Sequence, residues 1–547
     1  MFFCKMERKS RLAMLYYLQI TEASMKDLTT SVYNFEDLIQ GNFLYVDKTE
    51  YVWQLIRPAQ EMYFLSRPRR FGKSLLISTL KAIFEGKREL FRGLALYDKP
   101  YKWEQFPVIH LSFGDYGVVK DALGELSEYL MSKMMTLAEE HSVKLTKTTP
   151  GLCFAELIDT LAKQKKVVIL IDEYDKPILN NITDKNVGEI LKCLKGFYSV
   201  LKDRNKQERL LFITGVSKFS HVSLFSELNN LTDITLNPDY AGMLGFTEAE
   251  VRESFADRIP EAARANGVPE EGLMESLMEW YDGYRFSRAD VYVCNPVSIT
   301  KFFANHAEFA NYWDTTGTPS FLLEQMGKRA YDLEAALNET YDEGIFSAYE
   351  LDCLDITGLL WQTGYLTIRE LAPAPRRMKY RLGFPDYEVE DTFMKRLLEH
   401  FCNVPKGTSE DMIEKFQDAI ANDDLQGFMT LFQAFLARVP YGIHLRDERY
   451  YQSVFFVVFR MLGLMIEAES QTNQGRIDAY IRTEKAVFIF EFKLDRSAEE
   501  AVGQILDRKY YEKFQDSGLP IRLVGVNFDS EKGRIEKWQE TTPPSGK

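Results

Sequence analysis

The sequence lacks the cysteine and histidine patterns on which structural metal sites depend. Its 547 residues include six cysteines and six histidines, and no two cysteines form a C-x-x-C pair. The scattered cysteines therefore argue against a zinc site or a disulfide framework, and are typical of reduced thiols in a cytosolic protein. The sequence also has no apolar run near the roughly 18 residues of a membrane-spanning helix, no internal repeat and no low-complexity tract.

Positive charge is also scarce. The chain has 67 Lys and Arg residues against 81 Asp and Glu residues, a formal net charge of -14. This balance argues against a protein coated in basic charge for nonspecific binding of nucleic acid. It leaves room for a local basic groove, because an acidic chain can still gather Lys and Arg on one face.

The first 24 residues contain the one stretch with a faint likeness to a targeting signal. Basic residues precede the apolar stretch 12–20, but that stretch is short and is interrupted by tyrosines and Gln19. We therefore interpret 1–24 as an N-terminal extension rather than a signal peptide, with Met25 as a candidate start.

Alternating strand and helix patterns predict an α/β doubly wound sheet in the first half of the chain. The expected strands are short apolar runs of the kind found in buried parallel sheets, at 62–65, 108–113, 167–171 and 210–213. The expected helices lie between them, at 73–84, 121–142, 152–163 and 186–203.

The loop between the first strand and the first helix has the features of a phosphate-binding loop. Gly72 provides flexible backbone at the start of the helix, Lys73 provides a cation for the β- and γ-phosphates, and Ser74 provides a hydroxyl for Mg²⁺. The general pattern has an earlier glycine where this sequence has Arg67, so the motif is a variant. A basic turn without a ligand is the alternative interpretation.

Two acidic residues follow the buried strand at 167–171. In P-loop enzymes the first, here Asp172, organises Mg²⁺, and the second, here Glu173, polarises the attacking water. Packing alone is a poor explanation for two carboxylates at the end of a buried strand, because unpaired buried charge is costly.

Four further residues are candidates for contact with phosphate. Thr214 and Ser217 follow the strand at 210–213, where a side chain that senses the γ-phosphate would lie; a simple strand-end turn is an equal alternative. Arg69 and Arg70 would contact phosphate or a neighbouring subunit, or form a solvated basic loop.

A second constellation near the C-terminus indicates a nuclease. Glu491 and Lys493 are two apart on an apolar strand and so share a face, which Asp478 on the preceding strand can reach. The two carboxylates, with Glu469 as a further candidate, would hold Mg²⁺. Lys493 would orient or deprotonate the attacking water. An ordinary salt-bridged strand end is the alternative.

Between these two regions the pattern is mainly helical. Thr247 and Glu250 form a capping-box signature that opens a helical region. Two strands at 363–370 and 378–384, joined by a Pro-rich turn at 372–375, follow further helix. This arrangement is compatible with a winged-helix module whose wing carries basic residues, or with a plain connecting hairpin; the basic residues are Arg376, Arg377, Lys379 and Arg381.

The motifs together closely resemble bacterial proteins that pair an AAA-ATPase-like P-loop domain with a C-terminal PD-(D/E)XK nuclease domain. The resemblance runs from about Met25 to about residue 540. The segments that carry it are 45–49, 64–74, 170–175, 280–284, 295–296, 384–389, 475–478 and 491–494. Arg67 is itself part of this family's pattern. Gln504 and Tyr510 follow on a predicted helix, where related nucleases carry a Gln and a Tyr near the site.

The resemblance implies ATP binding, a Mg²⁺-dependent nuclease-like domain and a cytoplasmic setting. Mn²⁺ is the alternative metal at the nuclease site. We expect five parts along the chain. These parts are an extension (1–24), the AAA-ATPase-like P-loop domain (25–240), a helical lid (241–345), a winged-helix-like or connecting module (346–400) and a restriction-endonuclease-like α/β domain (401–547).

We predict an ATPase that controls cleavage of DNA or RNA, with DNA favoured and no membrane partner. Defence or mobile-element biology is an analogy only. Homo-oligomers are compatible with this prediction, since many P-loop domains receive an arginine from a neighbour; Arg204 and Arg209 are candidates. The alternative is a nucleotide-dependent switch or scaffold whose C-terminal domain binds without cutting. A helicase-like motor is disfavoured, because no helicase motif set lies between 74 and 240.

Overall fold

A computed structural model provides the structure. It describes most of the chain, and the described ranges are 25–117, 122–182, 186–218, 228, 230–313, 320–328, 331–347, 355–375, 377–402, 408–436, 460, 471–472, 475–476, 479–529, 531–532 and 534–544. The extension at 1–24 lies outside them. No helix among these residues is long and apolar enough to cross a membrane.

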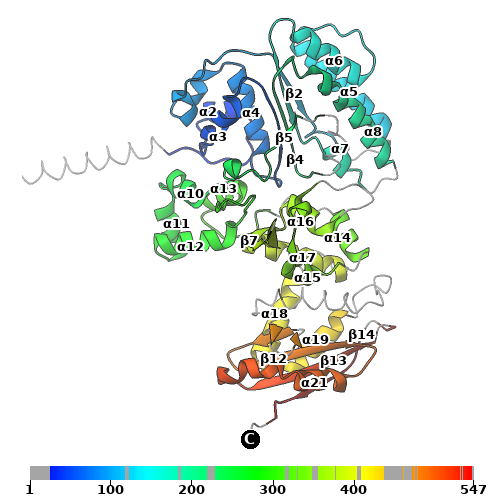
Figure 1. Cartoon of the computed structure of the whole chain (residues 1–547). Helices are drawn as coiled ribbons and strands as arrows, with labels where there is room; N and C mark the ends of the chain where they lie inside the picture. Colours follow the sequence, from blue (N-terminus) through cyan, green and yellow to red (C-terminus); the bar gives the residue numbers. More distant parts are fainter. Residues whose placement is uncertain are drawn as a thin grey trace, which may run out of the picture. The chain divides into compact units, whose positions relative to one another are not determined.

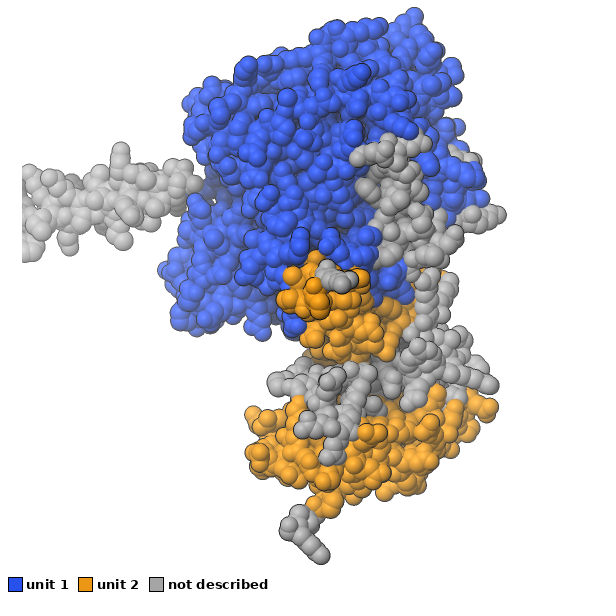
Figure 2. Space-filling model, in the orientation of Figure 1, with its two compact units in different colours: residues 1–313, 343–371, 385–387 blue, residues 314–342, 372–384, 388–547 orange. Residues whose placement is uncertain are grey.

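The chain divides into two compact units, which Figure 2 shows in different colours. Unit 1 comprises residues 1–313, 343–371 and 385–387, and unit 2 comprises 314–342, 372–384 and 388–547. The region that we expected to act as a lid is therefore shared between the units, because 241–313 belongs to unit 1.

Unit 1 is built around a parallel five-stranded sheet in the order β2-β3-β4-β1-β5. The strands are β1 (Glu61–Ser66), β2 (Val108–Ser112), β3 (Val167–Asp172), β4 (Glu208–Gly215) and β5 (Thr232–Asp233). All residues of β3 and β4 are buried, which explains their uninterrupted apolar runs. The four strands expected from the sequence are thus confirmed, and the very short β5 is an addition.

Helices cover both faces of this sheet, as a doubly wound fold requires. Figure 1 shows α2–α4 on one side of the strands and α5, α6 and α8 on the other. The helices are α2 (Phe35–Gln40), α3 (Thr49–Ile56), α4 (Lys73–Phe84), α5 (Ala122–Glu140), α6 (Pro150–Leu161), α7 (Lys176–Leu179) and α8 (Val187–Tyr198).

The helical part of unit 1 has a second core. Its helices are α10 (Glu248–Ser254), α11 (Ile259–Asn266), α12 (Glu270–Tyr281) and α13 (Pro296–Ala304). The capping box at Thr247 and Glu250 is confirmed at the start of α10. Val46, from the segment before α3, is buried in the same core as Val251 and Phe255, so the N-terminal segment is packed against these helices.

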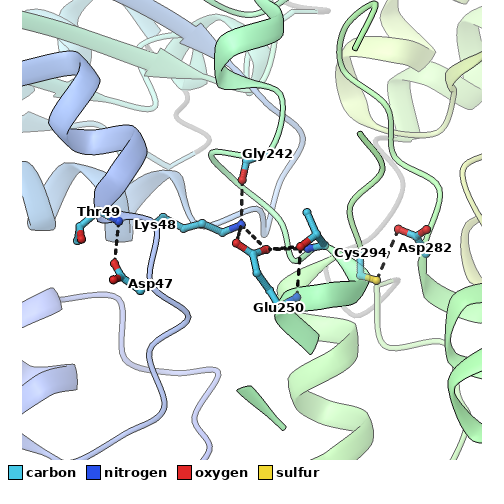
Figure 3. Close-up of polar contacts among 8 residues, drawn as sticks. Asp47, Lys48, Thr49, Gly242, Glu250, Asp282 and Cys294 are labelled. Atoms are coloured by element: carbon cyan, nitrogen blue, oxygen red, sulfur yellow. Dashed lines mark hydrogen bonds and ion pairs between the residues drawn. The ribbon is translucent and has the colours of Figure 1, made fainter. Parts of the chain in front are cut away.

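A partly buried ion pair reinforces that packing. Lys48 Nζ lies 2.6 Å from the Glu250 carboxylate and donates a hydrogen bond to the carbonyl oxygen of Gly242 at 2.8 Å (Figure 3). Because the same Glu250 closes the capping box of α10, one carboxylate both starts this helix and anchors it to the N-terminal segment.

The segment between α13 and the C-terminal domain contains short helices and a three-stranded sheet in the order β6-β8-β7. The elements are α14 (Ser320–Lys328), α15 (Leu333–Asn338), β6 (Thr340–Tyr341), α16 (Ile356–Thr363), β7 (Thr367–Ala374) and β8 (Arg377–Gly383).

The first strand of the expected hairpin was placed wrongly. Thr363 ends helix α16, since Gly364 caps it in the left-handed conformation with φ of 90°. Strand β7 then continues to Ala374, through most of the expected turn. Apolar and β-branched residues are common to strands and buried helices, so the pattern alone did not separate them.

The C-terminal part of unit 2 holds a four-stranded mixed sheet in the order β11-β12-β13-β14. Strands β12 and β13 are parallel, and the outer pairs are antiparallel. Its elements are α17 (Tyr387–Cys402), α18 (Thr408–Ala421), α19 (Leu425–Leu436), β9 (Gln471–Thr472), β10 (Gly475–Arg476), β11 (Ala479–Arg482), β12 (Val487–Leu494), α21 (Ala498–Asp507), β13 (Ile521–Asp529) and β14 (Arg534–Thr541).

Candidate functional sites

The phosphate loop connects β1 to α4, at the carboxyl edge of the parallel sheet. Gly72 is the N-cap of α4 and has φ of 88°, a conformation that favours glycine. The first backbone N–H groups of this twelve-residue helix have no intrahelical partners. The loop therefore presents the donors and the helix terminus that an anionic phosphate needs.

Lys73 is buried, and its ammonium group is held by the loop itself. Nζ donates to the carbonyl oxygens of Arg67 and Pro68 at 2.9 and 2.7 Å. Burial lowers the pKa of Lys73 to about 8, although the negative charge of Asp172 opposes this fall. The cation is thus positioned at the loop and is poorly solvated, which favours a phosphate partner.

Arg67, which stands where the general pattern has glycine, is a structural residue. Only 1% of it is exposed, and its guanidinium donates to the carbonyl oxygens of Ser66 and Thr235 at 2.9 and 2.8 Å. The guanidinium also lies 4.3 Å from the centre of the Phe286 ring. It therefore joins the loop to the chain after β5 and to the helical part, a role that the motif alone did not reveal.

The two neighbouring arginines differ in their surroundings. Arg69 is exposed. Arg70 has φ of 67°, and its guanidinium donates to the carbonyl oxygen of Tyr312 at 2.9 Å. Both remain predicted phosphate ligands, and Arg70 additionally ties the loop to residue 312.

The acidic pair ends β3 beside this loop. Asp172 is 3% exposed and accepts a hydrogen bond from Ser74, while its Oδ1 has no hydrogen-bond partner among the described residues. Burial raises its pKa, and the bond from Ser74 and the charge of Lys73 oppose that rise. Glu173 has the left-handed φ of 54°, and its Oε2 lies 3.1 Å from Lys176 Nζ.

The two candidates after β4 have separate environments. Thr214 is fully buried, and its hydroxyl has no hydrogen-bond partner within the described part of the chain. Ser217 instead donates its hydroxyl to Asp175 at 2.7 Å. Thr214 thus stays a candidate for contact with phosphate, and Ser217 is explained by the structure. Asp175 was not singled out from the sequence, where only its place beside Asp172 and Glu173 distinguished it.

The two arginines considered for a neighbouring subunit are bound within this chain. Arg204 forms two hydrogen bonds with Asp159, at 3.0 and 2.8 Å. Arg209 is 8% exposed and donates to the carbonyl oxygen of Ile56 at 2.6 Å. Arg209 belongs to the amino end of β4, and its burial argues against a contact with a neighbouring subunit.

At the candidate nuclease site, Glu491 and Lys493 lie on one face of β12. Lys493 Nζ donates to Glu491 Oε1 at 2.9 Å, and Glu491 is only 1% exposed. Val487 and Ile489, on the same face by the period of two, belong to a core with Ile505 of α21. The pair therefore lies on the side of the sheet that α21 covers.

The close approach of α21 to the sheet supports the placement of Glu491 and Lys493 on the face that α21 covers. Gly525 is paired with Glu491, and a Cβ built on it would lie 2.3 Å from the carbonyl oxygen of Ala498. Gln504 lies on α21, as expected. Tyr510 does not: the helix ends at Asp507, and Tyr510 begins a 3₁₀-helix in which it is buried in the core.

Asp478 and Glu469, the other predicted metal ligands, lie outside the described residues. The chain neighbour of Asp478, Ala479, is paired with Phe490, the neighbour of Glu491. Within the described ranges, no three His, Cys, Asp or Glu residues are grouped to hold a metal ion. The metal site thus stays a prediction for which Glu491 is the described carboxylate.

The basic hairpin is partly neutralised by an acidic residue. Arg377 and Lys379, both in β8, form ion pairs with Asp342 at 3.3 and 3.0 Å. Arg376 lies outside the described residues. These pairs weaken the argument for a basic wing, and the winged-helix interpretation remains a prediction.

These two regions define a class of protein: a P-loop-like α/β domain in one chain with a nuclease-like mixed sheet. A family model described as a predicted AAA-ATPase matches residues 29–225, and one described as the PD-(D/E)XK nuclease superfamily matches 446–538.

The chain belongs to the family that combines these two domains, as the resemblance in the sequence indicated. It is 36% identical over 525 residues to "Uncharacterized protein in vnfD 5'region" from Azotobacter chroococcum mcd 1. The match covers 94% of this chain and 98% of that relative, so the similarity extends over the whole arrangement.

Proposed function

We propose that this protein binds and hydrolyses ATP, and that the nucleotide controls a nuclease domain that cuts DNA or RNA. One observation carries the nucleotide half. Lys73, Asp172 and Thr214 come from the loop after β1 and from the carboxyl ends of β3 and β4, which are neighbours in the sheet. Ligands of open α/β sheets bind at this edge.

The residues present fit ATP with Mg²⁺. The hydroxyl of Ser74 and the carboxylate of Asp172 are oxygen donors, which a hard cation prefers. Asp172 Oδ1 and the Thr214 hydroxyl are buried polar atoms without hydrogen-bond partners among the described residues, and such atoms are costly unless a ligand or water satisfies them. Bound Mg²⁺ would neutralise phosphate charge, and Glu173 would orient the attacking water.

The nuclease half rests on the buried pair at β12. A carboxylate beside a lysine on one face of a sheet supports a metal-dependent phosphodiesterase, in which Glu491 with Asp478 and Glu469 would hold Mg²⁺ or Mn²⁺. Lys493 would orient or deprotonate the water. Its hydrogen bond to Glu491 shows that the ammonium already reaches the carboxylate that would bind the metal.

Two contacts within unit 1 support transmission of the nucleotide state. Arg70 connects the phosphate loop to Tyr312, and the Lys48–Glu250 pair connects the N-terminal segment to α10. Closure around ATP would move the helical region as a lid and pass the nucleotide state to the C-terminal domain. We also propose a cytoplasmic location, which is compatible with the free thiols of Cys153, Cys193 and Cys294.

The first test is cleavage of supercoiled plasmid, single-stranded DNA and RNA with Mg²⁺ or Mn²⁺, with and without ATP. Wild type is compared with Lys493→Ala, and with Lys485→Ala as a control on the preceding turn. Cleavage by wild type and by Lys485→Ala, together with no cleavage by Lys493→Ala, supports the nuclease. If no protein cuts any substrate while ATP still binds, the nucleotide-dependent switch or scaffold replaces this proposal.

A further inference from the structure

Asp175 is a buried carboxylate that accepts hydrogen bonds from the residues directly after β4. It is 1% exposed and accepts hydrogen bonds from the backbone N–H and hydroxyl of Ser217, both at 2.7 Å. It also lies 3.2 and 3.3 Å from the backbone nitrogen of Val216. These donors stabilise a carboxylate whose pKa burial raises.

The same chain is held by Tyr174. Its backbone N–H donates to the carbonyl oxygen of Thr214 at 3.2 Å, and its hydroxyl donates to that of Ser217 at 3.0 Å. The packing is so close that a Cβ on Gly215 would lie 2.6 Å from Asp175 Oδ1. The acidic segment at 172–175 and the segment at 214–217 are therefore held together and move as one.

The phosphate loop contacts this chain from the other side. The Arg67 backbone N–H donates to the carbonyl oxygen of Gly215 at 3.2 Å, and the Ser66 hydroxyl donates to that of Val216 at 2.7 Å. Residues 214–217 are thus fixed between the two segments that would surround the phosphates and the metal.

Lys218, the next residue along the chain, contacts α16. The backbone N–H of Lys218 donates to Gln362 Oε1 at 2.9 Å, and Gln362 Nε2 donates to the carbonyl oxygen of Ser347 at 3.1 Å. Gln362 is 2% exposed. A buried amide whose two ends are both used fixes one relative position of α16 and Lys218.

A second contact joins α16 to the phosphate loop. Gly364, which caps α16, lies so near Pro68 that a Cβ on it would be 2.6 Å from Pro68 Cβ. Strand β7 begins three residues later, at Thr367, and the boundary between the two units falls within β7, after Leu371.

We propose that residues 214–218 form a connector that passes occupancy of the phosphate site to α16, with Asp175 as its positioning residue. The inference rests on the proposed nucleotide site and adds its route of regulation. A phosphate bound by Lys73 and Thr214 shifts the loop and the connector, and the Lys218–Gln362 contact moves α16 with them. Residues 367–371 carry that displacement to the unit boundary along the chain.

The test is hydrogen–deuterium exchange of the full-length protein with and without a non-hydrolysable ATP analogue and Mg²⁺. In wild type we expect slower exchange both in α4, which reports binding, and in α16 through residue 366. Gln362→Met, which removes the acceptor and roughly keeps the volume, should retain the response of α4 and lose that of α16. Asp175→Asn should do the same.

Thr363→Val is the matched control, because the Thr363 hydroxyl donates only to carbonyl oxygens of its own helix among the described residues. It should keep both responses. An α4 response without any α16 response in wild type would overturn the connector and leave nucleotide binding intact. No α4 response would overturn both proposals. The comparison of wild type with and without the analogue decides between these outcomes, even if a variant does not fold.

Discussion

Lys493 donates a hydrogen bond to Glu491 across 2.9 Å, from two residues further along the same face of β12. Glu491 is almost fully buried while Lys493 is partly accessible, with side-chain exposures of 1% and 12%. This arrangement places the Lys493 ammonium beside a buried carboxylate, which is compatible with the proposed metal site.

Replacement of Glu491 by Gln should abolish cleavage. The neutral amide keeps the shape of the side chain but loses the negative charge that would hold the metal, so we expect a loss of about 10²-fold or more. Plasmid nicking with Mg²⁺ measures the effect. Glu499→Gln is the control, because Glu499 is exposed and pairs with Lys537 at the surface. Equal cleavage by both variants would contradict the assignment.

ATP affinity should fall as the pH rises above about 8. Burial lowers the pKa of Lys73 to about 8, so free protein loses the loop cation above that pH. Each further pH unit then weakens binding by up to about tenfold. Calorimetric titration at about pH 7 and about pH 9 measures the change. Lys73→Met should bind weakly at both values, and an unchanged affinity of wild type would contradict the prediction.

The same shift affects stability in the opposite sense. Because the folded-state pKa of Lys73 is below its ordinary value of 10.5, the unfolded chain binds this proton more tightly. Its contribution therefore makes the nucleotide-free protein more stable as the pH rises from about 8 to about 10.5. Urea unfolding of wild type and Lys73→Met over this range separates it from other groups; identical pH profiles would contradict it.

Arg67→Gly, which restores the general phosphate-loop pattern, should destabilise the folded protein. It removes a buried guanidinium that donates to backbone carbonyls, and we expect a loss of about 3 kcal/mol in the free energy of unfolding. Arg69→Gly in the same loop is the control, because Arg69 is exposed; it should cost less than about 1 kcal/mol. Similar midpoints of denaturant unfolding for the two variants would refute the structural role of Arg67.

Gly215→Ala should also destabilise the protein, because the new Cβ would lie 2.6 Å from Asp175 Oδ1 and 2.7 Å from the Tyr174 ring. A cost of about 1–3 kcal/mol is expected for such overpacking. Gly196→Ala is the control: it lies in α8, and beyond its own helix backbone no atom of the described residues lies within 4 Å of the added Cβ. This change should stabilise the helix by about 0.5–1 kcal/mol. Thermal unfolding distinguishes the two signs.

The sequence predicted the elements whose pattern of apolar residues follows directly from their burial. Helix α4 begins at Lys73 and ends at Phe84, as expected, because its phosphate loop and its apolar face mark both ends. Parallel strands β3 and β4 were recognisable since both of their faces are buried. Strand β7 was misplaced, because an apolar stretch beside Gly364 fits either a helix or a strand.

Long-range contacts explain what the sequence did not predict. Arg67 looked like a departure from a motif, yet its partner Thr235 is 168 residues away in the chain. Asp175 carried no signal beyond its place beside Asp172 and Glu173, and Gln362 carried none, since their partners lie at 216–217 and at 218 and 347. A pattern within a short window reports burial and local turns, whereas buried polar contacts between distant segments need the fold.

The central claim is that the nucleotide site controls cleavage, and Lys73→Ala tests it most directly. Cleavage by wild type and by this variant is measured with and without ATP, alongside ATP hydrolysis. The account predicts that ATP changes the cleavage rate of wild type, whereas the variant hydrolyses no ATP and cleaves at one rate in both conditions. A variant that cleaves as wild type does, with and without ATP, would contradict it.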